Sequence, residues 1–312
     1  MEDLKLIPVH TGPLDTFPAS QELPDGVAAV RWTDEPGSMV DFRLDVPYDE
    51  RDGETLFLQI LLPMDFMFMF GPPKKFPLIV YVPGSAWHRQ MTKMSITQML
   101  KYCELGYAVA ITQYRPSDVA PFPAQIEDAK TAVRFMRKHA EEYQIDPDKI
   151  ALYGDSSGGH TVVAAGITGN GTLDNGTYGE FSCEVNCIVD CFGPTDIAKM
   201  NYYPSSIDHI GADAPEGMLL GGVNVLENPD RAEKVSPMYY LSREKAIPPI
   251  LILHGDGDQL VPFNQSVRLY EKLRELGKDV TMYKLLGASH GMGGFNSREA
   301  RDTIDGVIKK YT

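Results

Sequence analysis

The sequence predicts an α/β fold in which a mostly parallel, doubly wound sheet carries helices on both faces. Two observations predict it: short apolar runs alternate with helix-periodic segments along the chain, and the later runs are apolar almost throughout. Runs of that kind are typical of parallel strands that are buried on both faces, and strand–helix alternation is the pattern of this fold class. With 312 residues, 43% of them hydrophobic, the chain can bury one large core, so we expect a single domain over residues 1–312.

The predicted elements begin after an N-terminal arm. Residues 1–27 contain four prolines and no periodicity, so we expect an extended arm on the surface of the domain. Strands are expected at about 39–46, 55–63, 77–82, 107–113, 150–153, 185–191, 249–254 and 279–286. Helices are expected at about 94–105, 122–143, 158–167, 264–277 and 297–311.

Three segments interrupt this alternation. Residues 168–180 are rich in turn-forming residues and are expected to form a surface loop. Residues 197–238 lie between two core strands and are expected to form a small cap over the strand ends. Residues 64–70 are rich in Met and Phe, which leaves two interpretations: a hairpin packed on the sheet edge, or an exposed patch that binds a second copy of the chain in a homodimer.

Charge and composition argue against several classes of partner. The formal net charge of −14 opposes binding to nucleic acid and to anionic lipid surfaces. The first residues are not those of a signal peptide, and no segment approaches the roughly 18 apolar residues of a membrane span. We therefore expect a cytoplasmic protein without nucleic-acid or membrane partners.

The four cysteines are expected to be reduced. Cys183, Cys187 and Cys191 are four residues apart, which is also a spacing that metal sites use. Residues 185–191 form a predicted buried strand, however, in which positions four apart share a face and sulfur fills core volume. We therefore expect core packing here, and neither a metal site nor a cofactor.

Residues 154–158 read Gly-Asp-Ser-Ser-Gly and stand between a predicted strand and a predicted helix. A serine on such a tight strand-to-helix turn needs small neighbours, so Gly154 and Gly158 flank it and its hydroxyl projects above the sheet. The five-residue pattern alone is weak, but the strand before it and the helix after it make it specific. We predict that Ser156 is a nucleophile.

A serine hydroxyl needs a general base and an acid that orients this base. Asp258 lies in the loop after a predicted strand and is the expected acid; Asp256 is the rival, although its Gly-Asp-Gly turn suits a carboxylate that binds backbone amides. His290 follows the last predicted strand and completes the chain order serine, acid, histidine, so it is the expected base. We expect His160 and His254, next to the serine and the acid loop, to be buried structural residues. The other histidines are His10, His88, His139 and His209.

The anionic oxygen of a tetrahedral intermediate needs backbone N–H donors that already point at it. Ser157 is expected to supply one, because its amide stands at a helix N-terminus. The second is expected from the loop at residues 82–88, here called the oxyanion loop, where Ser85 and Ala86 are the candidates. Trp87 in the same loop is either a wall of the substrate pocket or an ordinary core aromatic residue.

Together these motifs resemble the α/β-hydrolase esterase/lipase family, in particular its bacterial carbohydrate and feruloyl esterase-like branch. The resemblance covers about residues 35–312 and includes Gly154–His160, Pro121–Asp128, Gly193–Asp196 and His254–Pro262. It implies an α/β-hydrolase fold with Asp258 as the acid of a serine triad. One departure is that relatives carry a His-Gly-Gly-Gly-Trp type of loop where this chain has Pro-Gly-Ser-Ala-Trp.

The leading hypothesis is therefore a metal-free serine carboxylesterase that acts on a small-molecule ester. The resemblance implies a short acyl group, such as acetyl, or a feruloyl group, carried on a carbohydrate. Two alternatives stay open. One is an amide hydrolase, either a peptidase of the prolyl-oligopeptidase type or an arylformamidase, because the same triad cleaves amides. The other is a hydrolase-fold protein that binds a ligand without chemistry.

Overall fold

A computed structural model describes residues 8–12, 16–30, 39–64, 74–291 and 293–312. The chain divides into two units, Met1–Glu35 and Pro36–Thr312. The described residues of the first unit are all exposed, and none of them lies in an α-helix or a β-strand. The first unit ends eight residues beyond the expected arm of residues 1–27, and the placement of this arm on the surface of the domain stays a prediction.

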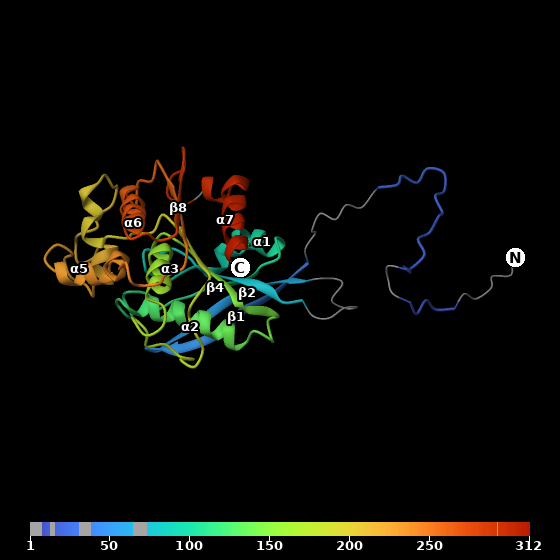
Figure 1. Cartoon of the computed structure of the whole chain (residues 1–312), viewed down its shortest axis with the longest axis horizontal. Helices are drawn as coiled ribbons and strands as arrows, with labels where there is room; N and C mark the ends of the chain where they lie inside the picture. Colours follow the sequence, from blue (N-terminus) through green and yellow to red (C-terminus); the bar gives the residue numbers. More distant parts are fainter. Residues whose placement is uncertain (1–7, 13–15, 31–38, 65–73, 292) are drawn as a thin grey trace. The chain divides into compact units, whose positions relative to one another are not determined.

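The second unit contains an eight-stranded sheet with the order β1-β2-β4-β3-β5-β6-β7-β8 (Figure 1). The strands are β1 (Met39–Arg51), β2 (Glu54–Met64), β3 (Phe76–Val82), β4 (Ala108–Thr112), β5 (Ile145–Asp155), β6 (Cys187–Cys191), β7 (Ile250–Gly255) and β8 (Val280–Leu285). β2 pairs antiparallel with β1 and with β4, and every other pairing is parallel. The predicted doubly wound α/β fold is confirmed.

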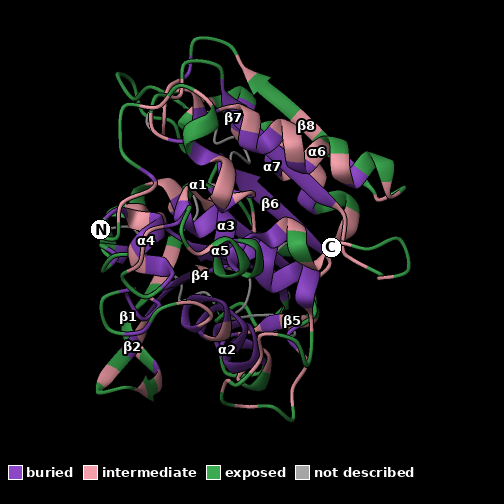
Figure 2. Ribbon diagram, turned by 90° about the vertical axis from the view of Figure 1, so that its left-hand side faces the viewer, coloured by how far each residue is buried: buried purple, intermediate pink, exposed green. Residues whose placement is uncertain are grey.

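Helices cover both faces of the sheet because successive strand residues point to opposite sides. Leu78, Val80 and Val82 of β3 belong to one apolar cluster, together with residues of α2 (Ala124–Lys138), α3 (Ser157–Thr168) and α6 (Asn264–Glu275). Ile79 and Tyr81 belong to the other, together with residues of α1 (Ile96–Glu104) and α7 (Arg298–Tyr311). The buried strands accordingly run between the helices in Figure 2.

Residues 197–238, the segment expected to form a cap, fold into short helical pieces. These are the 3₁₀ helices η4 (Ile197–Tyr202) and η5 (Pro237–Tyr240) and the α-helices α4 (Pro215–Leu219) and α5 (Pro229–Val235). Ala232 and Val235 of α5 join the apolar cluster that contains α3. The cap is therefore packed on the same layer of the fold as the helix that follows the predicted nucleophile.

β1 ends at Arg51 rather than near residue 46, and two further element boundaries differ by five residues from the sequence-based expectation. β5 begins at Ile145 rather than near residue 150, because Ile145 pairs with Phe76 at the start of β3. α2 ends at Lys138 rather than near residue 143, since the chain must turn before it enters β5. Both differences lie in polar stretches, where apolar periodicity gives no signal.

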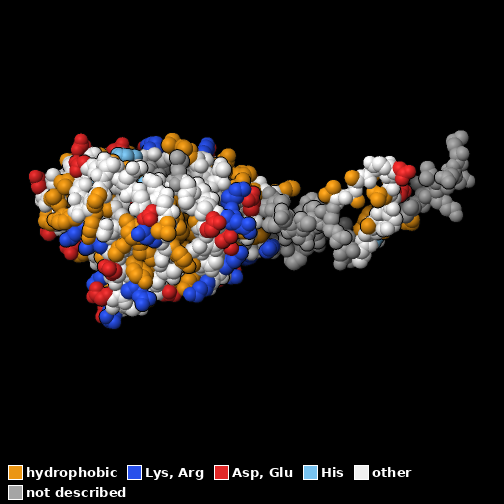
Figure 3. Space-filling view, turned by 90° about the horizontal axis from the view of Figure 1, so that it is seen from above, with side chains coloured by type: hydrophobic (Ala, Val, Ile, Leu, Met, Phe, Trp, Pro, Cys, Tyr) orange, Lys and Arg blue, Asp and Glu red, His pale blue; other side chains and the backbone are white. Residues whose placement is uncertain are grey.

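The expectations that concern the cysteines, membrane spans, surface charge and residues 64–70 can be compared with the structure one by one. All four cysteines are free and buried, and Cys187 and Cys191 lie on one face of β6, whereas Cys183 precedes the strand and packs in the opposite cluster. No helix among the described residues is long and apolar enough to cross a membrane. Basic side chains on the face shown in Figure 3 lie among acidic ones. Except for Met64, the Met- and Phe-rich segment at 64–70 lies outside the described residues.

Candidate active site

Ser156 stands on a strained turn between β5 and α3. Its φ of 53° and ψ of −127° lie outside the regions that most L-residues occupy. A Cβ atom at Gly158 would overlap the carbonyl oxygen of Val82, and one at Gly154 would overlap that of Gly158. The two glycines are thus required by close backbone contacts, as the pattern of residues 154–158 predicts.

The turn brings Ser156 to two side chains from far along the chain. His290 Nε2 lies 3.0 Å from Ser156 Oγ, and His290 Nδ1 lies 2.8 Å from Asp258 Oδ2. Since a carboxylate only accepts hydrogen bonds, Nδ1 carries the proton and Nε2 is free to accept one from the serine hydroxyl. The three residues singled out in the sequence therefore lie in contact, in the order that general-base activation of a serine needs.

The carboxylate of Asp258 is held by four donors. Besides His290, it accepts hydrogen bonds from the amides of Leu260 and Val261, at 2.9 Å each, and from His254 Nε2 at 3.2 Å. Burial alone would raise the pKa of Asp258, but the hydrogen bonds from the two imidazoles outweigh it and hold the pKa well below its usual value. Asp258 therefore stays ionised and fixes the orientation of the His290 ring.

The competing residues have other partners. Asp256 accepts a hydrogen bond from the amide of Gly287 at 2.7 Å, which is the structural role expected for it. His254 is buried, and its Nδ1 lies 2.7 Å from the hydroxyl of Ser266. His88 is exposed and is not among the residues that line the cavity at Ser156.

The oxyanion loop differs from the expectation at one position. The amide of Ser85 donates to Ser157 Oγ at 2.9 Å, and an amide has a single hydrogen to give. The Ser85 part of the predicted oxyanion hole is therefore revised, and the amides of Ala86 and Ser157 remain as candidates. Ala86 and Trp87 both take a left-handed conformation, with φ of 54° and 57°, which is strained for residues that carry a Cβ atom.

Side chains that sequence reasoning did not single out hold this loop in place. The carboxylate of Asp155 accepts hydrogen bonds from the Tyr81 hydroxyl at 2.6 Å and from the amide of Gly84 at 3.0 Å. The buried hydroxyl of Tyr114 lies 3.2 Å from Ser157 Oγ and 3.0 Å from Ser85 Oγ. These side chains thus hold the backbone of the oxyanion loop at Gly84 and Ser85.

Trp87 is both a core residue, with 1% of its surface exposed, and a residue that lines the cavity. Its Nε1–H donates to His160 Nδ1 at 3.2 Å, and His160 Nε2–H donates to the carbonyl of Val235 at 2.9 Å. Burial lowers the pKa of His160 to about 4, so the ring is neutral at ordinary pH. His160 therefore links the oxyanion loop to the end of α5, a structural role that agrees with the sequence-based expectation.

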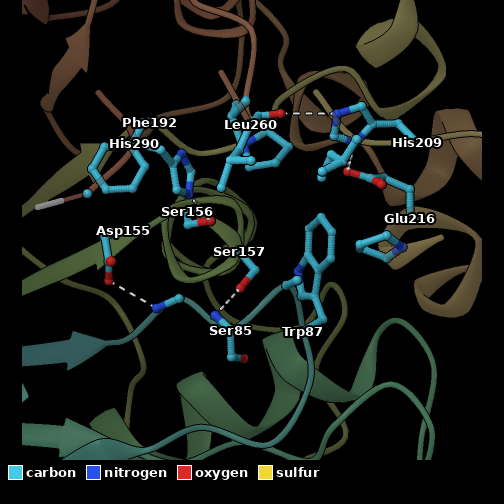
Figure 4. Close-up of a pocket in the computed structure, with 17 residues that line it drawn as sticks. Ser85, Trp87, Asp155, Ser156, Ser157, Phe192, His209, Glu216, Leu260 and His290 are labelled. Carbon is cyan, nitrogen blue, oxygen red and sulfur yellow. Dashed lines mark hydrogen bonds and ion pairs between the residues drawn. The ribbon is translucent and has the colours of Figure 1, made fainter. Parts of the chain in front are cut away.

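A cavity of about 300 Å³ opens above Ser156 (Figure 4). The loops after the strands form one part of its wall, with Ala86, Phe192 and His290. The cap forms another part, as its position in the sequence predicts. The cap residues that line the cavity are Ile207, His209, Pro215 and Glu216.

Two wall residues give no clear signal in the sequence. The Phe192 ring packs edge-to-face on the His290 ring, with 4.6 Å between ring centroids, and so limits the rotation of the base. Glu216 lies in the short helix α4, whose five residues are too few to show a periodicity in the sequence. Among the described residues there is no group of three or more side chains arranged to hold a metal ion.

Comparison with known proteins gives a consistent picture. The BD-FAE family model matches residues 64–273, about two thirds of the chain. The chain is 28% identical over 240 residues to the "Probable carboxylic ester hydrolase LipM" of Mycobacterium tuberculosis, an alignment that covers 74% of this chain and 53% of LipM. This chain thus spans about half the length of the curated relatives that it matches.

Solved structures add two neighbours at 30% identity, each with a TM-score of 0.74. One is a truncated form of a carbohydrate esterase from gut microbiota, and the alignment covers 89% of this chain and 98% of that one. The other is a bifunctional GH43-CE protein of Bacteroides eggerthii, for which the alignment covers 86% of this chain and 35% of that one. Together with the family match and the sheet topology, these similarities show that the chain belongs to the BD-FAE family and has the α/β-hydrolase fold.

Proposed function

We propose that this protein is a serine carboxylesterase. The observation that carries the proposal is the continuous contact from Ser156 Oγ through both nitrogens of His290 to Asp258. The relatives named above support it, since LipM and the gut protein are both named as ester hydrolases. The cavity at Ser156 is large enough for a small ester, and its wall is mostly apolar.

The proposed reaction has two halves. Ser156 Oγ attacks the ester carbonyl while His290 Nε2 takes its proton, and the amides of Ala86 and Ser157 stabilise the negative oxygen. His290 then gives this proton to the leaving alcohol, and an acyl group remains on Ser156. A water molecule, deprotonated by the same nitrogen, attacks the acyl group, and the proton returns to Ser156 as the carboxylic acid leaves.

The proposed substrate is a short-chain acyl ester, with acetylated or feruloylated carbohydrate as the finer assignment. The support for carbohydrate is the naming of the two solved neighbours, one as a carbohydrate esterase and one as a GH43-CE protein. Amide hydrolysis is the competing activity, because the same triad performs it.

A direct test compares p-nitrophenyl acetate, a peptide anilide and N-formylkynurenine as substrates. We expect the ester to be cleaved fastest, and Ser156→Ala to lower its turnover by at least about 10⁴-fold. Asp258→Asn is expected to lower kcat by about 10³- to 10⁴-fold, because His290 loses the acceptor that fixes its tautomer. Faster cleavage of an amide would contradict the esterase assignment. Unchanged turnover in Ser156→Ala would contradict the serine mechanism itself.

A further inference from the structure

The cap contributes a pair of titratable side chains that the proposed reaction does not use. His209 and Glu216 are 1% and 2% exposed, and both line the cavity above Ser156. His209 Nδ1 lies 2.9 Å from Glu216 Oε1. Both residues belong to the cap segment, and Figure 4 shows their side chains next to each other in the wall of the cavity.

The positions of the protons in this pair follow from its neighbours. His209 Nε2 lies 2.8 Å from Ser205 Oγ and 3.1 Å from the carbonyl oxygen of Leu260, to which the Ser205 hydroxyl itself donates. Because a carbonyl only accepts hydrogen bonds, Nε2 must carry a proton. One further proton then lies between Nδ1 and Glu216 Oε1, whether the pair is written as charged or as neutral.

Glu216 Oε2 is a pure hydrogen-bond acceptor in both descriptions. It is buried, and it has no hydrogen-bond partner in the part of the chain that the structure describes. Leaving a buried acceptor unpaired costs about 1 to 3 kcal/mol of folding free energy. By contrast, both nitrogens of His209 and Oε1 of Glu216 have hydrogen-bond partners. His209 contacts both Ser205 and Leu260 through Nε2, and its Nδ1 uses only Oε1 of Glu216, so these contacts do not require the second carboxyl oxygen.

Most other side chains that the cap and its surroundings present to this cavity are apolar. They include Ile207, Pro215, Leu260 and Val261. Asp155 also lines the cavity, and its Oδ1 accepts hydrogen bonds from the Tyr81 hydroxyl and the amide of Gly84. Among the described residues, Glu216 is the carboxyl group of this wall that has a buried oxygen without a hydrogen-bond partner.

We propose that Glu216 is a specificity-determining residue whose carboxyl group accepts a hydrogen bond from a hydroxyl group of the substrate. His209 is a positioning residue that holds this carboxyl group in the wall. The inference rests on the proposed esterase function and adds to it that the ester carries a free hydroxyl beside the reacting bond. A hydroxyl satisfies the unpaired acceptor, and an alkyl group of the same size does not.

The test uses two series of esters in which the distance between the hydroxyl group and the ester bond varies, because the distance that suits Glu216 is not known in advance. Hydroxyalkyl acetates and ethyl hydroxyalkanoates of two to four carbons are each compared with the matching ester in which methyl replaces hydroxyl. We expect the full-length protein to prefer at least one hydroxylated ester over its match by about tenfold or more in kcat/KM. E216M is expected to erase this preference, because kcat/KM should fall about tenfold more on the hydroxylated ester than on its match.

Two control variants separate specificity from structure. E216Q keeps a neutral acceptor and is expected to keep a reduced preference, and it carries the test if E216M does not fold. Glu227→Met changes an exposed cap residue and is expected to change nothing. Equal losses on both members of each ester pair in E216M would show a merely structural residue and overturn the proposal.

Further outcomes distinguish this proposal from the one on which it rests. If the protein hydrolyses none of these esters, or if Ser156→Ala is fully active, the proposed function fails. If the unmodified protein hydrolyses the esters without any preference for hydroxyl, only the Glu216 proposal fails. Faster turnover of acetylcholine than of 3,3-dimethylbutyl acetate, lost in E216Q, would assign an organic cation to Glu216 and overturn the hydroxyl.

Discussion

Asp258 and Asp190 are both buried, yet their pKa values move in opposite directions because their partners differ. Asp258 has two imidazoles and two amides around it, which favour the ionised form. Asp190 on β6 has one such partner, the amide of Gly193 at 3.0 Å, and its Oδ2 has none among the described residues. Burial therefore raises the pKa of Asp190 to about 7, against the effect of that single hydrogen bond.

Asp190→Asn is expected to become relatively more stable as the pH rises. The folded protein holds the Asp190 proton up to about pH 7, whereas the unfolded chain releases it near pH 4, so the unmodified protein loses stability across this interval. Between pH 5 and pH 8 the free energy of unfolding of the variant should gain about 2 to 3 kcal/mol on that of the unmodified protein. Urea denaturation at the two pH values measures this gain.

Asp118→Asn, at an exposed position, serves as the matched control and should show no comparable gain. If the difference between Asp190→Asn and the unmodified protein is the same at both pH values, Asp190 is already ionised in the folded state and its assigned pKa is wrong.

At the scale of elements, one arginine joins three pieces of the fold. Arg115 follows β4, is 4% exposed, and forms hydrogen bonds to both carboxyl oxygens of Asp128 on α2. It also reaches Asp52 in the turn between β1 and β2 and the carbonyl of Ala124. The antiparallel edge of the sheet is thus connected to α2 through a buried, charge-assisted network.

Arg115→Met is expected to lower the free energy of unfolding by about 3 to 5 kcal/mol, because it leaves the fully buried Asp128 without its cation. Chemical denaturation measures the loss. Arg89→Met provides the comparison, since Arg89 pairs with Glu54 with more than half of its side chain exposed, and such pairs contribute at most about 1 kcal/mol. Similar losses in the two variants would refute a special role for the buried network.

The elements that could be predicted from the sequence are those with an apolar signature. The central strands and α3 are buried nearly throughout, and Ser156 and Asp258 follow two such strands. The Gly-Asp-Ser-Ser-Gly pattern, these strands and the chain order together select Ser156, Asp258 and His290. The oxyanion loop was less predictable, because which amide is free depends on whether a hydroxyl such as that of Ser157 occupies it. Glu216 lies in a segment whose position is fixed by tertiary contacts, which leave no periodic trace.

At the scale of the whole molecule, the described core and the candidate active site lie within one unit. The sheet, both apolar clusters and the cavity belong to Pro36–Thr312. The net charge of −14 opposes binding to polyanions but does not select a substrate.

A chain that begins at Pro36 is therefore expected to keep its kcat/KM for p-nitrophenyl acetate within about twofold, because every side chain of the candidate site is retained. Enzyme assays and thermal unfolding of the shortened and full-length proteins check this expectation. A large fall in activity or in Tm would show instead that residues 1–35 support the site from the surface of the domain.

The two hydrogen bonds of His160, with Trp87 and Val235, affect how the stability of the protein depends on pH. Because its pKa is about 4, the His160 ring gains no proton in mildly acidic solution, and the two hydrogen bonds persist. The unfolded chain does take up that proton below about pH 6.5, which makes unfolding progressively easier as the solution is acidified. Weak acid should therefore shorten the lifetime of this protein at elevated temperature while leaving the contact between Trp87 and His160 beside Ser156 intact.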